Sequence, residues 1–375
     1  MAKVRKRTWS NPQGRQCRAF IVDWIDNKGG RQRKQFTKYR EADQFRIKIE
    51  GELSRGIYRA DATRITVEEL CTEFLEHCKG RMQRNERMTR KMLVVYRGHI
   101  NNHILHAGHG LGARKLSQLT TSGVGDFRDA LRNSGVSVVT TRKILSTLHA
   151  AIAFAISKDW VATNVAHGVR VIGPRDEGAK KVIPPSKPDL MAILENSNSD
   201  LKLKIMFAAL TGLRASEQWG LRWDDVDLNR DEIHVRRRID AYGSEGPTKS
   251  KAGVRTIPLS DALVKSLKEH KIGSRFKEQN DFVFPNSKGS HTRHDNHIKR
   301  HYRPALEAAV VSGINWHSLR HFAVSSWIEQ GLPPKAIQTY AGHSSLSVTM
   351  DRYGHLFPDE SHKAAMDTIA GDLLG

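Results

Sequence analysis

The chain has 375 residues, which predicts two or three domains, and its hydrophobic share of 38% is enough for extended apolar cores. A formal net charge of +21, from 61 lysines and arginines against 40 acidic residues, favours an acidic polymer as partner, most simply nucleic acid. The sequence excludes a disulfide framework, because its three cysteines form no CxxC pair and fit a reducing cytoplasm. It also excludes a membrane protein, because no stretch approaches the roughly 18 apolar residues that a membrane span needs.

The first 60 residues carry a large share of the positive charge, with 16 lysines and arginines against 6 acidic residues. Strands are predicted over 18–24 and 31–36, joined by the turn sequence Asn27-Lys28-Gly29-Gly30, and a helix is predicted over 41–56. This segment is either a small α+β domain with a solvated basic face or a DNA-binding module. The excess of charge favours DNA binding.

Residues 65–166 are predicted to be helical throughout. Thr66 and Glu69 have the spacing of a capping box, and the longest helix is expected from Ser137 to Lys158. Apolar residues at helical spacing predict a core. The basic residues between them form either an ordinary solvated face or a face that clamps DNA: Arg81, Arg84, Arg87, Arg90, Lys91, Arg97, Arg142 and Lys143.

A stretch rich in proline and glycine, Gly168 to Pro188, predicts a linker. The remainder, roughly residues 176–375, mixes helices with a short β-meander whose strands are expected over 232–237 and 255–259. The predicted domains are therefore 1–60, 65–166 and 176–375.

Within the last domain, Arg214 follows an apolar helix that ends at Thr211-Gly212. Gly212 is a helix C-cap signal, so we expect Arg214 in a tight turn, with Glu217 close enough to orient it. The short string Thr-Gly-Leu-Arg taken alone is typical of a surface arginine at a helix end.

A second group of polar residues lies more than a hundred residues downstream. His317 and Arg320 share one helical face, His343 follows Gly342, which permits a sharp turn, and Tyr353 comes ten residues later. Arginine matches phosphate oxygens two at a time, histidine moves protons near neutral pH, and a tyrosine hydroxyl can form a covalent intermediate. These residues predict a phosphate-handling site with its own nucleophile.

Two neighbours of these residues are predicted to lie outside the chemistry. His321 points elsewhere on the helix of His317, so we expect it to be structural or to support the site from behind. Tyr340 precedes the Gly-His turn and is expected to be a structural tyrosine.

In this order and spacing, the residues Arg214, His317, Arg320, His343 and Tyr353 closely resemble the tyrosine recombinase (phage integrase) family. The resemblance covers the whole chain in plan, with strong motifs confined to roughly 205–360. It implies an α+β multidomain fold. An arm-type DNA-binding domain with a small three-stranded sheet plus helix comes first, then a helical core-binding (SAM-like) domain, then a mostly helical catalytic domain with a small β-meander.

The family also carries a lysine on a β-hairpin, ahead of a pattern of Arg, Thr, Ile, Pro and Leu. Register puts Lys249 in this role, and Lys251 stays an alternative because a shift of two residues keeps the same face of a strand. The resemblance implies that this lysine is the general acid to the leaving 5′ oxygen. It assigns His317 to proton management and phosphate contact, and Arg320 to clamping the non-bridging oxygens together with Arg214.

The function implied by the resemblance is that of a prophage integrase, which cuts and rejoins DNA through a 3′-phosphotyrosine at Tyr353. The arginines and the lysine supply the positive charge that a metal would otherwise bring, so we expect no metal and no cofactor. The implied partners are double-stranded DNA at attachment sites and further copies in a homotetramer, with an excisionase and a DNA-bending host factor as additional candidates. The implied location is the bacterial cytoplasm, at the nucleoid.

Two other functions share parts of this pattern: a type IB topoisomerase-like relaxer and a non-catalytic DNA-binding prophage remnant. The filled motif positions show no decay. A rival metal site at His291, His294, His297 and His301 lacks an HExxH motif, and a basic helix face near DNA explains it better. The apolar residues of 358–375 predict a short helix, either exchanged between subunits, as in the family, or docked on its own chain.

Overall fold

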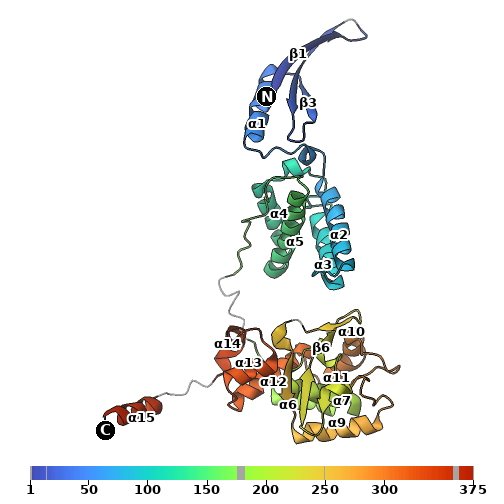
Figure 1. Ribbon diagram of the computed structural model, residues 1–375, viewed down its shortest axis with the longest axis vertical. Helices are drawn as coiled ribbons and strands as arrows, with labels where there is room; N and C mark the ends of the chain where they lie inside the picture. The colour runs from blue at the N-terminus through green and yellow to red at the C-terminus, as the bar shows by residue number, and fades with distance from the viewer. Residues whose placement is uncertain (1, 14, 175–181, 249, 358–362, 375) are drawn as a thin grey trace. The chain divides into compact units, whose positions relative to one another are not determined.

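The computed structural model describes residues 2–13, 15–174, 182–248, 250–357 and 363–374. The chain divides into two compact units, residues 1–177 and 178–375, which are described separately (Figure 1). Helices with small antiparallel sheets make up both units, which confirms the predicted α+β class. No described helix is long and apolar enough to cross a membrane.

The first unit begins with a three-stranded antiparallel sheet in the order β1-β2-β3, covered by one helix. Val22 in the central strand pairs with Val4 on one side and Lys34 on the other. Trp24 packs edge-on against Phe45 of the helix and closes a small core. The elements are β1 (Lys3–Ser10), β2 (Gln16–Ile25), β3 (Arg31–Phe36) and α1 (Tyr39–Ser54).

The three-stranded sheet is confirmed, although its first strand was not located from the sequence pattern. β1 is almost entirely exposed and half of its residues are charged, so it lacks the apolar alternation that identifies a half-buried strand. It forms because the long β2 offers a free edge, with which Lys3 to Ser10 pair over the full length of β1.

The rest of the first unit is a helical bundle around one apolar core. The predicted capping box starts its first helix: Glu69 N donates to Thr66 Oγ1 at 3.2 Å, and Thr66 N donates to Glu69 Oε2 at 2.7 Å. Leu70, Phe127 and Leu148 are among the buried residues. The elements are η1 (Ala60–Thr63), α2 (Val67–Gln83), α3 (Arg90–His99), η2 (Ile100–Ile104), η3 (Leu116–Gln118), α4 (Thr121–Asn133) and α5 (Val138–Ser157).

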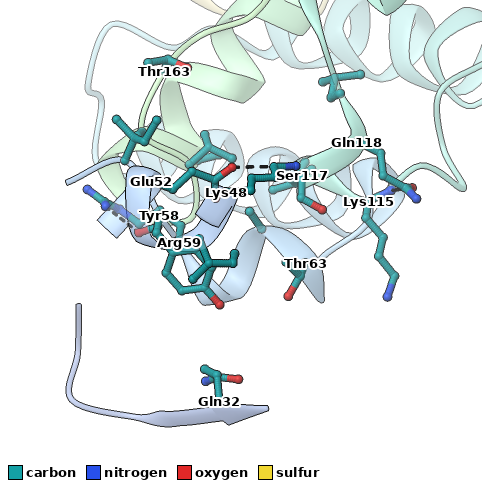
Figure 2. A pocket seen from close by; sticks show the side chains of 18 of the residues that line it. Gln32, Lys48, Glu52, Tyr58, Arg59, Thr63, Lys115, Ser117, Gln118 and Thr163 are labelled. Carbon is teal, nitrogen blue, oxygen red and sulfur yellow. Dashed lines mark hydrogen bonds and ion pairs between the residues drawn. The ribbon is translucent and has the colours of Figure 1, made fainter. Parts of the chain in front are cut away.

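A cavity of about 740 Å³ lies inside this unit, where the sheet and α1 meet the helical bundle. In Figure 2, Gln32 lies on the strand at the bottom of the view, Glu52 lies to the left, and Lys115 and Gln118 lie to the right. Beside it, Arg59 Nε donates to Asp159 Oδ1 at 2.5 Å and ties the segment after α1 to the end of α5. None of the predicted catalytic residues lines this cavity.

The second unit packs its helices around α7 (Ser199–Thr211), which is buried on nearly all sides and contacts α12 (Trp316–Glu329). The small sheet has the order β4-β5-β8, and a separate pair, β6-β7, lies between β5 and β8 in sequence. The strand predicted over 232–237 is therefore interrupted at Arg236, where the chain leaves one sheet for the other.

The remaining elements of the second unit have the following bounds: α6 (Lys187–Glu195), α8 (Ala215–Gln218), η4 (Trp223–Asp225), β4 (Val226–Asp227), β5 (Glu232–Val235), β6 (Arg237–Ile239), β7 (Glu245–Pro247), η5 (Lys251–Gly253), β8 (Arg255–Pro258), α9 (Asp261–Gly273), α10 (His294–His297), η6 (Ile298–Tyr302), α11 (Arg303–Ala308), α13 (Pro334–Ala341), α14 (Leu346–Tyr353), η7 (Gly354–Leu356) and α15 (Lys363–Leu374). A small apolar cluster joins α12, α13 and α14 and includes Val324, Ile337 and Tyr353.

The helical core of the first unit can be tested with two substitutions in α5. Leu148→Ala removes a side chain that is 0% exposed and should lower the free energy of unfolding of this unit by about 2–5 kcal/mol. Val139→Ala, at a side chain that is 53% exposed, should change it by less than about 0.5 kcal/mol. Hydrogen exchange of the intact chain, followed in peptides from α2 to α5, measures both effects, and equal protection in the two variants would contradict this assignment of the core.

Candidate active site

The turn that carries Arg214 is built as predicted. α7 ends at Thr211, and Gly212 follows in the left-handed conformation, with φ +61°. A Cβ at this position would lie 2.8 Å from the ring of Trp327, so glycine is required by both backbone and packing. The turn leaves Arg214 at the N-cap of α8, one turn before Glu217.

Glu217 is a buried carboxylate held between two arginines. Arg214 Nη1 donates to Glu217 Oε1 at 2.8 Å, and Arg255 Nη2 donates to Glu217 Oε2 at 2.9 Å. The side chains of Glu217 and Arg255 are each only 1% exposed. Burial by itself would raise the pKa of the Glu217 carboxyl, but the charges of Arg255 and Arg214 hold it below its usual value. Glu217 therefore stays ionised and fixes both guanidinium groups.

The C-terminal carbonyls of α13 bind three different arginines. Arg255 Nε donates to Tyr340 O at 2.7 Å, Arg320 Nη2 donates to Ala341 O, and Arg214 Nη2 donates to Gly342 O at 2.9 Å. The last carbonyls of a helix have no partner inside it and carry its negative dipole end. Three consecutive carbonyls thus bring together three cations that are far apart in the sequence.

Arg320 is also bonded at its other end. Its Nη1 donates to Gly212 O at 2.7 Å, so this side chain, which is 3% exposed, joins the end of α7 to the end of α13. Burial, and then the charge of Arg214, lower the pKa of Arg320 from its ordinary value, but an arginine remains charged at neutral pH. Arg214 is the more open of the two, with 25% of its side chain exposed, and its guanidinium has five donors in all.

His343 follows the second left-handed glycine, Gly342, with φ +62°. Its Nδ1 lies 2.9 Å from Thr349 Oγ1 in α14, and the side chain is buried. Burial and the neighbouring cations, Arg320 first, lower its pKa to about 3, so the ring is neutral at pH 7. A neutral imidazole in this place can serve as a hydrogen-bond donor without adding to the positive charge.

Tyr353 is the last residue of α14 and is 1% exposed. Its ring packs against the cluster of Val324 and Ile337, and the ring of His343 lies nearly parallel to it at 6.2 Å. Its hydroxyl is 2.5 Å from His321 Nδ1. Burial raises the pKa of the Tyr353 phenol, an effect that Arg320 and Arg352 partly offset. The phenol is therefore protonated at neutral pH and needs a proton acceptor before it can attack.

The two histidines of α12 have different environments. His317 is exposed at the surface of the site, and its ring lies edge-on to that of His321 at 4.8 Å. Partial burial, followed by the charges of His321 and Arg320, lowers the pKa of His317. His321 is half-buried and touches the hydroxyl of Tyr353 directly. His321, which we expected to be structural or to support the site from behind, therefore contacts the expected nucleophile directly, because its ring lies towards α14.

Of the two candidates for the general-acid lysine, the structure describes only Lys251. Lys249 lies outside the described residues. Lys251 is exposed and opens η5, in a loop between β7 and β8, which belong to different sheets. The argument that a two-residue shift keeps the same strand face therefore does not apply to Lys251. The loop is tied to the site at Arg255, whose Nη1 donates to Gly253 O at 2.9 Å.

Arg255 is a site residue that the sequence reasoning missed. It entered that reasoning only as one position of the pattern after the lysine. Its isolated position in a strand of otherwise apolar inward residues, between Gly253 and Ile257, was the available signal. A charged residue at an inward strand position needs a buried partner, and here that partner is Glu217.

His294 and His297 do not belong to a basic helix face, which corrects the interpretation given above for these two residues, whereas His301 is exposed. His297 is buried and packs edge-on against Trp219 and Trp316, at 4.9 and 5.0 Å between ring centroids. His294 Nδ1 accepts from Trp219 Nε1 at 3.1 Å. Burial lowers the pKa of His297 to about 3, as expected for a neutral core histidine. Among the described residues, no group of three or more His, Cys, Asp or Glu is placed to hold a metal ion.

The predicted C-terminal helix forms as α15, over Lys363–Leu374. Met366, Ile369, Leu373 and Leu374 are all more than half exposed. The chain therefore leaves the apolar side chains of this helix largely uncovered.

The chain is similar in sequence to phage integrases and tyrosine recombinases. Residues 186–360 match the family model described as "Phage integrase family". The chain is 27% identical to a XerC-like tyrosine recombinase of Caldanaerobacter subterraneus subsp. tengcongensis over 307 residues, 74% of this chain and 78% of that protein. It is 23% identical to the ICEBs1 integrase of Bacillus subtilis over 363 residues, 92% of this chain and 94% of that protein.

Two solved structures share the fold. The Tn1549 transposon integrase in complex with transposon right end DNA aligns with a TM-score of 0.64 and 19% identity, covering 82% of this chain and all of that one. A lambda integrase dimer bound to a COC′ core site aligns with a TM-score of 0.57 and 18% identity, covering 95% of each chain. At these identities the likeness establishes the fold alone.

The charge network can be tested at Glu217. Glu217→Gln keeps the shape of the side chain but leaves the buried Arg255 without a counterion, which should lower the free energy of unfolding by about 3–5 kcal/mol. A matched change at the exposed carboxylate that pairs with Arg222, Glu245→Gln, should cost less than about 1 kcal/mol. Urea unfolding followed by hydrogen exchange in α7 and β8 measures both.

The same network predicts a pH dependence. The folded-state pKa of Glu217 is lowered from the ordinary value of 4.5, so its contribution to stability is present above pH 4.5 and is lost as the pH falls through the folded-state pKa. The stability difference between wild type and Glu217→Gln should therefore be constant near neutrality and shrink in acid. A difference that grows below pH 4.5 would contradict the ion-pair assignment.

Proposed function

We propose that the chain is a member of the phage integrase family, whose model its residues 186–360 match, and that it is a site-specific DNA recombinase that cuts and rejoins DNA through a covalent bond between Tyr353 and a 3′ phosphate. The observation that carries the proposal is the convergence of Arg214 and Arg320 on the adjacent carbonyls of Gly342 and Ala341, immediately before His343. This convergence gives a pair of guanidinium groups, already fixed by the protein, for one phosphodiester.

In the proposed mechanism, a scissile phosphate binds to the free donors of Arg214 and to Arg320, with His317 and His343 as further hydrogen-bond donors. Tyr353 attacks the phosphorus, and the phosphate oxygens gain charge in the pentacoordinate transition state. Guanidinium groups that are already held in place stabilise this charge without reorganising, which is the most effective form of electrostatic catalysis. The products are a 3′-phosphotyrosine and a free 5′ hydroxyl.

The leaving 5′ oxygen takes a proton from a lysine that follows β7 in the sequence, and we assign Lys249 to this role with Lys251 as the alternative. The phosphotyrosine bond conserves the energy of the broken phosphodiester, so a 5′ hydroxyl from another duplex can reverse the attack without ATP. The fixed cations supply the charge that the reaction requires, and the mechanism uses no metal or cofactor.

We propose that the rest of the chain positions the DNA. Residues 1–60 would bind arm-type sites, residues 65–166 the core site, and residues 176–375 would carry the chemistry. The exposed cations of β1 and β3, such as Arg5 and Arg31, suit contacts to phosphates. Steep weakening of DNA binding with rising salt is the corresponding physical signature.

Assembly follows from the reaction. Two duplexes offer four strands to cut, so we propose a homotetramer on attachment-site DNA. The uncovered apolar side chains of α15 suit a contact with a neighbouring copy. An excisionase and a DNA-bending host factor are the proposed accessory proteins for excision, and the bacterial nucleoid is the proposed place of action.

The nucleophile is tested by trapping the covalent intermediate. A pool of nicked duplexes with a randomised core is incubated with the protein, SDS-stable adducts are isolated, and the trapped DNA is sequenced to define the site. Wild type should form the adduct and Tyr353→Phe should form none. Tyr340→Phe should match wild type, because the ring of Tyr340 packs against Trp327 and the described partner of the Tyr353 hydroxyl is His321. An undiminished adduct from Tyr353→Phe would sink the proposal. Recombinant product from two sites separates an integrase from a pure relaxer.

The lysine is tested with a modified leaving group. Lys249→Ala should slow adduct formation by about 10²- to 10⁴-fold on ordinary DNA, because the 5′ alkoxide then leaves without a proton donor. A 5′-bridging phosphorothiolate should restore the rate, since a thiolate, with a thiol pKa of about 8.5, leaves unprotonated. Lys251→Ala should show neither the loss nor the rescue. The reverse pattern would transfer the role to Lys251.

A further inference from the structure

We propose that His321, a residue outside the expected catalytic set, is the general base that takes the proton of the Tyr353 hydroxyl during attack. The inference rests on the proposed function and adds a residue to the same site. Its basis is the 2.5 Å separation between His321 Nδ1 and the Tyr353 oxygen. Of the described hydrogen bonds, this one alone is made by that hydroxyl.

The hydrogen bond has one direction that fits both partners. Burial raises the pKa of the Tyr353 phenol, so its oxygen carries the proton and donates. Burial, and then the charges of Arg320 and Arg352, lower the pKa of His321, so its ring is neutral near pH 7 and Nδ1 can accept. The single N–H proton of the neutral His321 ring then lies on Nε2.

The local charges oppose proton transfer to His321 less when DNA is bound than when the site is empty. The titratable and charged groups that face His321 are His317 and Arg320 on α12 and Tyr353 and Arg352 on α14. Without DNA, the two arginines oppose a second positive charge on the imidazole. A phosphodiester bound to Arg320 brings negative charge and removes part of that opposition. The geometry thus links formation of the phenolate to the presence of the substrate.

The proton balance closes within the site. As the Tyr353 oxygen forms its bond to phosphorus, its O–H bond breaks and His321 Nδ1 gains the proton, giving an imidazolium. The 5′ oxygen leaves with a proton from the lysine. In the rejoining step, a 5′ hydroxyl attacks the phosphotyrosine and gives its proton to the lysine, which is a neutral amine after the first step, and the imidazolium returns its proton to the departing Tyr353 oxygen.

His317 is the alternative base, and the contacts separate the two. His317 is exposed and meets His321 ring to ring, whereas His321 is the residue that touches the hydroxyl. An exposed His317 is better placed to meet a phosphate arriving from solvent. The two histidines of α12 would therefore divide the work, with one contacting the DNA and the other the nucleophile.

The test compares two substitutions of His321 on a substrate that isolates the attack step. His321→Asn keeps a hydrogen-bond acceptor near the position of Nδ1 but cannot take a proton, and His321→Ala removes both functions. The substrate is the trapped site with a 5′-bridging phosphorothiolate, which makes the rate independent of the lysine. His301→Asn is the matched control, because His301 is exposed and contacts His297 instead of Tyr353.

Both His321 variants should form the adduct about 10²- to 10⁴-fold more slowly than wild type at pH 7, with site binding in gel shifts and circular dichroism unchanged. The wild-type rate should level off above the pKa of His321. The rate of His321→Asn should rise about tenfold per pH unit towards the pKa of the Tyr353 phenol, which burial raises above its ordinary value, because hydroxide then replaces the base. The control should follow the wild-type profile.

Three results would overturn the inference. A wild-type rate in His321→Asn at pH 7 would leave His321 as a positioning residue only. A faster rate in His321→Ala would show that the bond restrains the nucleophile. Loss of site binding together with activity would show a structural role. In each case the wild-type adduct and its absence in Tyr353→Phe leave the proposed function intact, whereas no adduct from wild type would remove both.

Discussion

The site depends on the end of one short helix. The carbonyls of residues 340 to 342, at the C-terminus of α13, accept hydrogen bonds from Arg255, Arg320 and Arg214 in turn. Three guanidinium groups so close together repel one another. The partial negative charge of the helix end and the carboxylate of Glu217 offset that repulsion before any phosphate arrives. Helix α13 thereby acts as an internal counterion for the cations of the site.

The two left-handed glycines give this arrangement its geometry. Gly212 turns the chain from α7 to Arg214 and lends its carbonyl to Arg320, and Gly342 turns the chain from α13 to His343 and lends its carbonyl to Arg214. Arg320 thus binds the end of α7, which precedes Arg214, and Arg214 binds the end of α13, which Arg320 also contacts. A Cβ at Gly342 would lie 2.9 Å from Arg255 Nη1, so the turn and the network occupy the same space. The two glycine turns therefore set both the path of the backbone and the positions of the arginines.

Much of the architecture followed from local sequence signals. The capping box at Thr66, the long helix α5 and the Gly212 cap are all short-range patterns, and their counterparts are present in the structure. Strand β1 was not predicted from the sequence, because it forms by pairing with β2 and its own side chains show no strand pattern. His321 was set aside because helical spacing describes a single helix, whereas its contact with Tyr353 depends on how α14 packs against α12. The contact between His321 and Tyr353 depends on tertiary packing, and the periodicity of a single helix does not predict such packing.

The carbonyl contacts at α13 have a consequence for how such chains diverge. A position that contributes only its main-chain oxygen places no chemical demand on its own side chain. Tyr340 is such a position towards Arg255: its ring meets Trp327, while its carbonyl serves the site. Related chains can therefore exchange the residue type there and keep the same network, provided that the helix ends at the same place. At this point the network therefore constrains where helix α13 ends, and it does not constrain the side chain of residue 340.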